Sequence, residues 1–279
     1  MARTYLELVE GTSSKFWEIV VDGTDHTVRY GKIGTDGRES TKSFDSDEEA
    51  LAQAEKLIRS KRKKGYAEPT VEGELVDVDT LRESYPVLEQ VDWLLDFVES
   101  GTLYKGNVTS GDEGLMDLAL EQGDEGTLVI IDGDLTITAN NAGWGDRAEF
   151  SNDGVLVTGN LTVNNLQLSE IGAVIVQGTM RAKNILVCYG DDGGSLDIGG
   201  DLIADVVIAS TYFVVDVAGE VKVGHIIGDS TYATDFAKGK EIISLYDEAN
   251  VFIDELSDDG EVEEWELYEK LTAGEEVFV

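Results

Sequence analysis

The sequence is poor in residue types that often carry structure or chemistry, since it holds one cysteine, two prolines and two histidines among 279 residues. A single cysteine excludes an intramolecular disulfide framework. No apolar run approaches the ~18 residues that a membrane-spanning helix needs. The first residues, Met-Ala-Arg-Thr-Tyr, do not form an apolar signal segment. We therefore expect a cytoplasmic protein without a membrane partner.

Catalytic motifs are also lacking. The two histidines, His26 and His225, fall in different parts of the chain, and the sequence contains no nucleophile elbow, phosphate-binding loop or zinc-ligand spacing. We therefore predict a protein that is not an enzyme and that holds no cofactor and no metal.

Positive charge is scarce in one part of the chain only. Residues 1–68 hold 12 basic and 13 acidic side chains, whereas residues 69–279 hold 9 basic and 44 acidic ones, within a total net charge of −36. This asymmetry predicts two modules. The acidic module should repel nucleic acid and attract cationic partners at long range.

The pattern Gly-polar-apolar-x-apolar occurs five times, beginning at Gly133, Gly159, Gly178, Gly200 and Gly219. The glycines are 26, 19, 22 and 19 residues apart, and the units between them contain short alternating or wholly apolar runs. A repeat near this length without a helical period is typical of a β-solenoid. We predict a mainly-β parallel β-helix of five or six coils over residues 127–253. A β-sandwich with turns at similar spacing is the alternative.

The segments on either side of the repeat are expected to close its ends, because open strand edges invite association. Residues 69–126 contain an apolar stripe at helical spacing between Val87 and Val98 and a second short one near Leu115, which predict a linker and a helical N-terminal cap. Residues 254–279 contain a short amphipathic helix around Trp265. We interpret them as an acidic C-terminal cap.

The first 68 residues follow an α+β pattern. Four short strands are predicted between Thr4 and Phe44, followed by a helix with Ser46 as its N-cap and Glu49 as the capping-box partner. The segments Lys15-Phe16-Trp17, Arg29-Tyr30-Gly31-Lys32, Lys42-Ser43-Phe44 and Lys63-Lys64-Gly65-Tyr66 resemble the WGR domain family, with Tyr30-Gly31-Lys32 at the name-giving Trp-Gly-Arg.

The resemblance implies a module that, in the eukaryotic poly(ADP-ribose) polymerases, binds DNA ends. The candidate nucleic-acid contacts in this sequence are Arg29, Tyr30, Lys32, Arg38, Lys61 and Arg62. Tyrosine is a smaller stacking platform than tryptophan, and lysine lacks the bidentate fork of arginine. Basic residues at a helix end also complement the helix dipole without any ligand. We therefore expect weak, salt-dependent binding at most.

Partner-binding candidates in the acidic module are Trp144 and Asp146, in a Gly-rich insert between the first two repeats, and Asp191 and Asp192, in an acidic turn. Inserts in solenoids often lie on the binding face. The acidic turn lacks the tandem nonapeptides of calcium-binding β-rolls, so we interpret its carboxylates as solvated.

Three functions are consistent with these patterns. The first is an acidic antitoxin or immunity-type protein that captures a basic protein partner, such as a bacterial toxin. The second is a DNA- or nucleotide-related adaptor that acts through the WGR-like module. The third is a scaffold or filament subunit, because the repeat loosely resembles that of the polymer-forming bactofilins.

Overall fold

The chain folds into two compact units, Met1–Thr70 and Val71–Val279, which we describe separately. The structure is a computed structural model that describes residues 2–10, 13–33, 35, 37–67, 71–111, 114–121, 126–143, 152–169, 172–188, 194–209, 213–228, 236–244, 252, 256–258, 261–262 and 264–278. Within these residues, no helix is both long and apolar enough to cross a bilayer.

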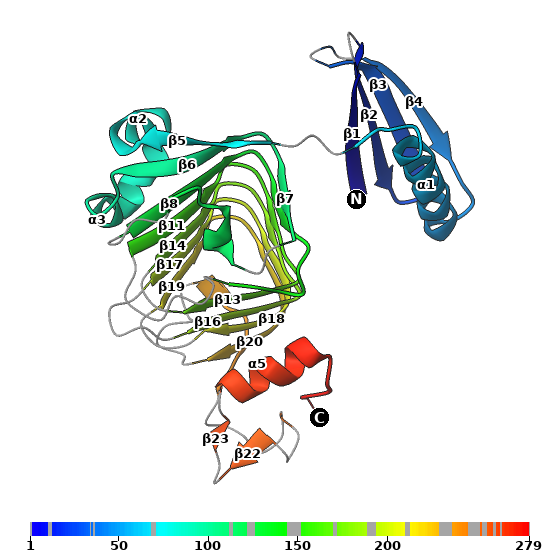
Figure 1. The fold of residues 1–279 in the computed structure, drawn as a ribbon. Helices are drawn as coiled ribbons and strands as arrows, with labels where there is room; N and C mark the ends of the chain where they lie inside the picture. Colours follow the sequence, from blue (N-terminus) through cyan, green and yellow to red (C-terminus); the bar gives the residue numbers. More distant parts are fainter. Residues whose placement is uncertain are drawn as a thin grey trace. The chain divides into compact units, whose positions relative to one another are not determined.

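The N-terminal unit is a four-stranded antiparallel sheet with one helix on a single face (Figure 1). Its elements are β1 (Ala2–Glu10), β2 (Ser13–Asp22), β3 (Asp25–Lys32), β4 (Arg38–Ser43) and α1 (Asp47–Arg62). The core between sheet and helix contains Leu6, Trp17, Ile19, Ala50 and Ala54. The inward-facing side chains of the strands and the apolar face of the helix thus pack together, as the sequence predicts.

The predicted N-cap of α1 is confirmed. The Ser46 side chain accepts a hydrogen bond from the backbone N–H of Glu49 at 3.2 Å. The Glu49 carboxylate reaches back to the N–H of Asp45 at 3.4 Å, one residue before the N-cap position that a capping box would use. Gly65 follows the helix with φ +85°, a left-handed conformation that glycine adopts without strain.

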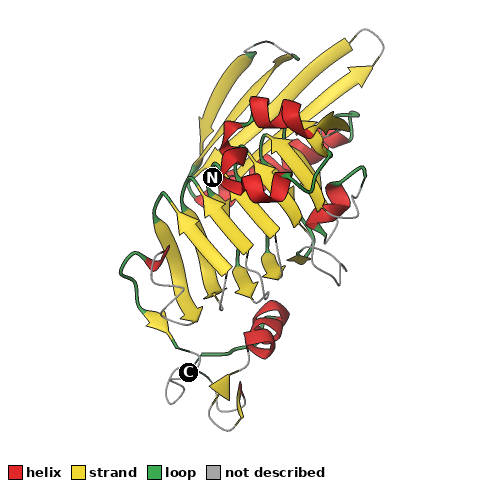
Figure 2. Cartoon of the chain, turned by 90° about the vertical axis from the view of Figure 1, so that its left-hand side faces the viewer, coloured by secondary structure: helices red, strands yellow, loops and turns green. Residues whose placement is uncertain are grey.

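The second unit is a parallel β-solenoid, as predicted (Figures 1 and 2). Its coils stack upon one another, and the strands of successive coils form two sheets. The first sheet contains, in spatial order, β19 (Phe213–Val217), β17 (Gly194–Ile198), β14 (Gly172–Val176), β11 (Asn152–Val157), β8 (Gly126–Asp132), β6 (Ser100–Lys105) and β5 (Gly73–Asp77). All pairs are parallel except that β5 runs antiparallel to β6.

The second sheet has two arms that join at the long strand β18 (Leu202–Ala209), which pairs with both β15 and β16. One arm contains β7 (Val108–Ser110), β9 (Leu135–Ile137), β12 (Leu161–Thr162) and β15 (Met180–Arg181). The other contains β10 (Asn141–Ala142), β13 (Asn165–Ser169) and β16 (Asn184–Cys188). The strands β20 (Val221–Gly228) and β21 (Ile242–Ile243) extend the sheet beyond β18.

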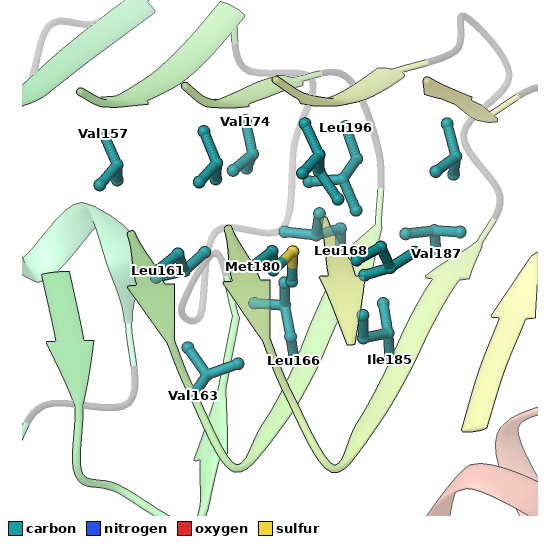
Figure 3. Close-up of a cluster of buried hydrophobic side chains, with 14 of the residues drawn as sticks. Val157, Leu161, Val163, Leu166, Leu168, Val174, Met180, Ile185, Val187 and Leu196 are labelled. Carbon is teal, nitrogen blue, oxygen red and sulfur yellow. The ribbon is translucent and has the colours of Figure 1, made fainter. Parts of the chain in front are cut away.

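Side chains from the two sheets meet in one interior core. Val155 lies in register with Val129 and Val174, and the side chains of such rows point between the sheets. Figure 3 shows Val157, Val174 and Leu196 facing Leu161, Met180 and Leu168 across this interior. Parallel pairing in register excludes the β-sandwich alternative, because that fold is built from antiparallel sheets.

The repeated glycines stack directly upon one another. The N–H of Gly178 donates to the carbonyl of Gly159 at 2.9 Å, and the N–H of Gly200 donates to that of Gly178 at 2.9 Å. A Cβ on Gly178 would lie 2.5 Å from the carbonyl oxygen of Gly159. None of the five glycines has a positive φ. Close backbone approach, not a left-handed turn, therefore explains glycine at these corners.

Side-chain amides and carboxylates add two further ladders at the corners. Next to the glycines, the N–H of Asn160 donates to Asp134 Oδ1 at 2.8 Å, and the N–H of Thr179 donates to Asn160 Oδ1 at 2.9 Å. At another corner, Asn184 Nδ2 donates to Asn165 Oδ1 at 2.9 Å, and both side chains are buried. These bonds satisfy polar groups where the chain bends away from the sheets.

The prediction placed the helices of residues 78–98 at the open end of the solenoid. In the structure they cover its side. The helices α2 (Val78–Ser84), η1 (Pro86–Val91) and α3 (Asp92–Leu95), which we call the helical cover, pack on the outer side of the first sheet. Their buried residues contact Leu103, Leu128, Ile130 and Leu156. These strands are apolar on both faces, so their outer face also needs a cover.

The C-terminal segment packs on the outer side of the last coils, where it contacts Ile227 of β20 and Phe278 stacks on His225. Its elements are β22 (Ser257–Asp258), β23 (Glu261–Val262) and α5 (Glu264–Ala273). Leu267, Tyr268 and Leu271 pack in one cluster with Val206 and Ile208, which point outward from β18. The predicted helix around Trp265 is therefore present, but it covers an apolar sheet face.

The short helix predicted near Leu115 and the region of Phe236 fill the two ends of the interior. At the N-terminal end, η2 (Leu115–Leu118) places Leu115 and Met116 in the solenoid core, and the Tyr104 hydroxyl donates to the Leu118 carbonyl at 2.7 Å. Near the C-terminal end, Phe236 is buried in the same core. The parallel ladder begins at β6, so the solenoid starts before residue 127, which was the predicted boundary.

Replacing Gly178 by alanine tests the close approach of the coils. The new methyl group would force neighbouring backbone apart, and overpacking of this kind costs about 1–3 kcal/mol. We expect Gly178→Ala to lower the free energy of unfolding by about this amount, measured by urea denaturation followed by circular dichroism. Gly111→Ala is the matched control, because a Cβ there would meet only Thr138 Oγ1 at 3.8 Å. Equal stability of the two variants would contradict the stacking requirement.

Candidate functional site

A pocket of about 550 Å³ opens in the N-terminal unit, where the ends of β2 and β3 meet the last turn of α1. We call it the lysine pocket, and it is lined by Ser14, Lys15, Phe16, Tyr30, Gly31, Lys32, Lys61 and Tyr66. Its volume lies in the range of small-ligand sites, which is about 300–1,000 Å³. Three cations and three aromatic rings thus converge on one opening.

The strand register brings two of the lysines together. Lys15 and Lys32 are direct cross-strand partners in the antiparallel pair β2–β3. Like charges in directly opposite positions destabilise a sheet. No ion pair joins Lys15, Lys32 or Lys61 to a carboxylate of the described residues. The positive charge of the pocket therefore has no counterpart in the described part of the chain.

Lys61 reaches the pocket from the last turn of α1. Its Nζ lies 5.3 Å from the ring centroid of Trp17 and 4.6 Å from that of Tyr66, within the range of cation–π attraction. Burial lowers the pKa of Lys61, and the charges of Lys64 and Lys15 lower it further. An anion in the pocket would relieve this repulsion between cations.

Arg29 is not part of the pocket. Its Nε donates to the Glu18 carboxylate at 2.6 Å, and the side chain of Glu18 is almost fully buried. The guanidinium carbon lies 5.2 Å from the ring centroid of Phe16. Successive strand residues point to opposite faces, so Arg29 lies on the face away from Tyr30 and α1. The hydrogen bond to Glu18 raises the pKa of Arg29 and holds it as a structural cation.

Of the six nucleic-acid contacts predicted from the sequence, three line the pocket and three do not. Tyr30, Lys32 and Lys61 line the pocket, and the Tyr30 side chain is 46% exposed. Arg38 is the cross-strand partner of Tyr30, and Arg62 lies exposed in the last turn of α1, but neither lines the pocket.

Among the pocket-lining residues, Lys15, Phe16 and Tyr66 were not candidates, although all three belong to the segments that resemble the family. The register that places Lys15 opposite Lys32 follows from the short turn at Asp22-Gly23, and this was the available signal.

The candidates in the acidic module have another outcome. Trp144, Asp146, Asp191 and Asp192 lie outside the described residues, so their proposed roles stay predictions. Further along the chain, Asp201 Oδ2 accepts a hydrogen bond from Lys222 Nζ at 2.7 Å, and this bond lowers the pKa of Asp201. Asp201 therefore belongs to an internal ion pair with Lys222.

Amine labelling tests the environment of Lys61. A lowered pKa leaves more of the amine neutral and nucleophilic at a given pH. We expect Lys61 to react with an acylating reagent with a midpoint pH below that of a lysine in an unstructured peptide, measured by mass spectrometry of labelled full-length protein. The Trp17→Leu variant keeps an apolar neighbour but removes the indole ring, so it shows how much the cation–π contact contributes to the midpoint pH of Lys61. A midpoint at or above that of the peptide lysine would contradict the burial and repulsion described for Lys61.

Comparison with known proteins identifies the first unit. Residues 2–73 match the WGR domain family. The uncharacterized protein YfeS of Escherichia coli is 50% identical over 56 residues, which cover 20% of this chain and 23% of YfeS. The protein YehF of Escherichia coli is 40% identical over 78 residues, 28% of each chain. Each match thus spans about a quarter of the relative's length.

Among solved structures, a Bacteroides fragilis protein is 20% identical, with a TM-score of 0.24, over 75% of this chain and 65% of that chain. This likeness is too distant to support an argument. The resemblance of the repeat to bactofilins stays a prediction. The family match and the sheet-plus-helix architecture agree on the first unit: residues 2–73 form a WGR domain, which precedes a parallel β-solenoid in the chain.

Proposed function

We propose that this protein is a non-enzymatic adaptor whose WGR domain binds a phosphate-bearing strand of nucleic acid in the lysine pocket. The observation that supports this function best is the set of three lysines that no described carboxylate neutralises, gathered around aromatic rings. Lysine ammonium groups bind phosphate as point charges, and each contact releases counterions from the nucleic acid. A WGR domain itself suggests a nucleic-acid-related module.

The aromatic rings of the pocket could contact the base and sugar of a nucleotide whose phosphate binds the lysines. Tyr30 is nearly half exposed beside Lys32 and offers a face on which a base or sugar can stack. Gly31 lines the pocket between Tyr30 and Lys32, and a Cβ there would lie 2.8 Å from Gly37 Cα, so close packing requires glycine at this position. Neither histidine lines the pocket, which favours binding over acid–base chemistry.

The acidic module limits this affinity. Residues 69–279 carry 44 acidic and 9 basic side chains, and their field repels an anionic strand. We therefore expect moderate binding that falls steeply as salt rises.

Lysine substitutions in the full-length protein test the adaptor function. We expect Lys32→Ala and Lys15→Ala each to weaken the binding of a fluorescein-labelled 20-nucleotide DNA strand. The slope of log affinity against log salt should fall in magnitude by about one for each lost phosphate contact. Fluorescence anisotropy at several salt concentrations measures both quantities.

Lys56→Ala is the control, because Lys56 is an exposed lysine of α1 that does not line the pocket. It should leave affinity and slope unchanged. Equal losses in all three variants would show non-specific attraction to the domain, and no binding by the parent protein at low salt would overturn the proposal.

A second candidate function is the capture of a basic protein by the acidic module, as an antitoxin or immunity-type protein would do. The charges of the solenoid unit favour it. Among its few basic side chains, Arg82, Lys105, Lys222 and Lys270 each pair with carboxylates of the same unit. The large excess of carboxylates is thus left for a cationic partner, whose approach the field would accelerate.

The acetylated and amidated peptide of nine arginines is a direct probe of the second candidate. We expect the full-length protein to bind it in isothermal titration calorimetry at 50 mM salt and to bind it more weakly at 500 mM, because salt screens exposed charges. Absence of binding at both salt concentrations would overturn capture of a basic partner and leave the adaptor function untouched.

A further inference from the structure

Two aromatic side chains lie exposed on the helical cover of the solenoid. Trp93 and Phe97 are each 45% exposed, although the cover is otherwise anchored by buried leucines and valines. The backbone N–H of Phe97 donates to the Leu94 carbonyl at 3.1 Å, so the helical turn continues past the end of α3. Residues four apart on such a turn are surface neighbours. Trp93 and Phe97 therefore both lie on the exposed side of this segment, and we call them the aromatic pair.

Buried leucines of the same turn anchor the aromatic pair to the first sheet. Leu94 and Leu95 are buried, and Leu94 packs so closely over β11 that a Cβ on Gly154 would lie 3.2 Å from its Cδ1. The same turn thus holds its leucines in the core and presents its aromatics outward. A rigid base of this kind lowers the entropy cost of binding a partner.

The segment that carries the aromatic pair is acidic. Residues 78–99 contain six acidic side chains and one basic side chain, Arg82. Arg82 lies 3.3 Å from one carboxylate oxygen of Asp92 and 3.3 Å from one of Asp96. Glu89, in η1 and four residues before Trp93, is exposed and has no ion pair within the described residues. The surface combines exposed rings with negative charge.

This combination fits an arginine side chain better than other occupants. A guanidinium can stack flat on an aromatic face and donate to a neighbouring carboxylate at the same time. A purely apolar partner would leave the carboxylates desolvated without compensation. A second copy of this chain would bring two strongly negative surfaces together. The charge of the module therefore favours a basic partner, and the rings favour arginine over lysine.

We propose that Trp93 and Phe97, together with Glu89, Asp92 and Asp96, form the docking site for an arginine side chain of a basic protein. The site rests on the second candidate function, the capture of a basic partner. It adds a location on the solenoid and a preference for arginine, which net charge alone does not provide.

Trp265 supplies a matched control. It is 42% exposed on α5 and lies among Glu264, Glu266 and Glu269, so it is an exposed tryptophan on another acidic helix. It has no second exposed aromatic beside it on α5. Non-specific attraction to acidic helices would treat the two tryptophans alike, whereas the proposed site distinguishes them.

The experiment compares nine-residue arginine and lysine peptides of equal charge by calorimetry with the full-length protein at 150 mM salt. We expect the parent protein to prefer the arginine peptide about fivefold, as a cation–π contact on a guanidinium allows. The double variant Trp93→Leu/Phe97→Leu keeps apolar side chains and removes both rings. It should lose this preference while still binding the lysine peptide as before. Trp265→Leu should retain the preference.

Far-ultraviolet circular dichroism confirms that each variant is folded. A double variant that still prefers arginine, or a parent protein that binds both peptides equally, would overturn the arginine site and leave capture of a basic partner standing. A parent protein that binds neither peptide would overturn both. If the double variant does not fold, the single variant Trp93→Phe, which keeps a smaller ring, should reduce the preference, and an unchanged preference would contradict the site.

Discussion

The close backbone approach of successive glycines is the constraint on which the solenoid depends. Gly159, Gly178, Gly200 and Gly219 each donate their N–H to the carbonyl of the repeat glycine in the preceding coil, and a Cβ at any of them would clash with that backbone. This contact sets the coils at the spacing at which every strand pairs with its neighbours and the inward rows of valine, leucine and isoleucine close into one core. The carboxylates and amides beside the glycines then satisfy the corner N–H groups.

Much of this fold could be predicted from the sequence, because the glycine column recurs at a regular spacing and the strands alternate. The placement of the flanking helices could not. An apolar helical stripe shows that a helix has a buried face, but it does not show which surface it covers. The informative signal was the run Ile185-Leu186-Val187, which is apolar throughout. Leu186 points outward and needs the C-terminal segment as its cover, as strands buried on both faces do.

The candidate site was predicted in part. Tyr30 and Lys32 follow from the family motif, and Lys61 follows from its position near the end of the helix. Lys15 enters the site through the strand register, whereas Arg29 lies on the opposite face of the sheet, where it pairs with the buried Glu18. Both facts depend on which residues face each other across the sheet, and pairing of this kind is weakly encoded in single positions.

The two units carry opposite kinds of surface. The WGR domain gathers three lysines that no described carboxylate pairs with, in an almost neutral unit, whereas the solenoid unit carries an excess of carboxylates. The central claim is that the lysine pocket is the ligand site of the WGR domain. Two-dimensional ¹H–¹⁵N NMR of the full-length protein during titration with a DNA strand tests it most directly. The claim predicts that the largest shifts occur at the backbone amides of Lys15, Gly31, Lys32 and Tyr66. Shifts that instead centre on Arg29 and the opposite face of the sheet would contradict it.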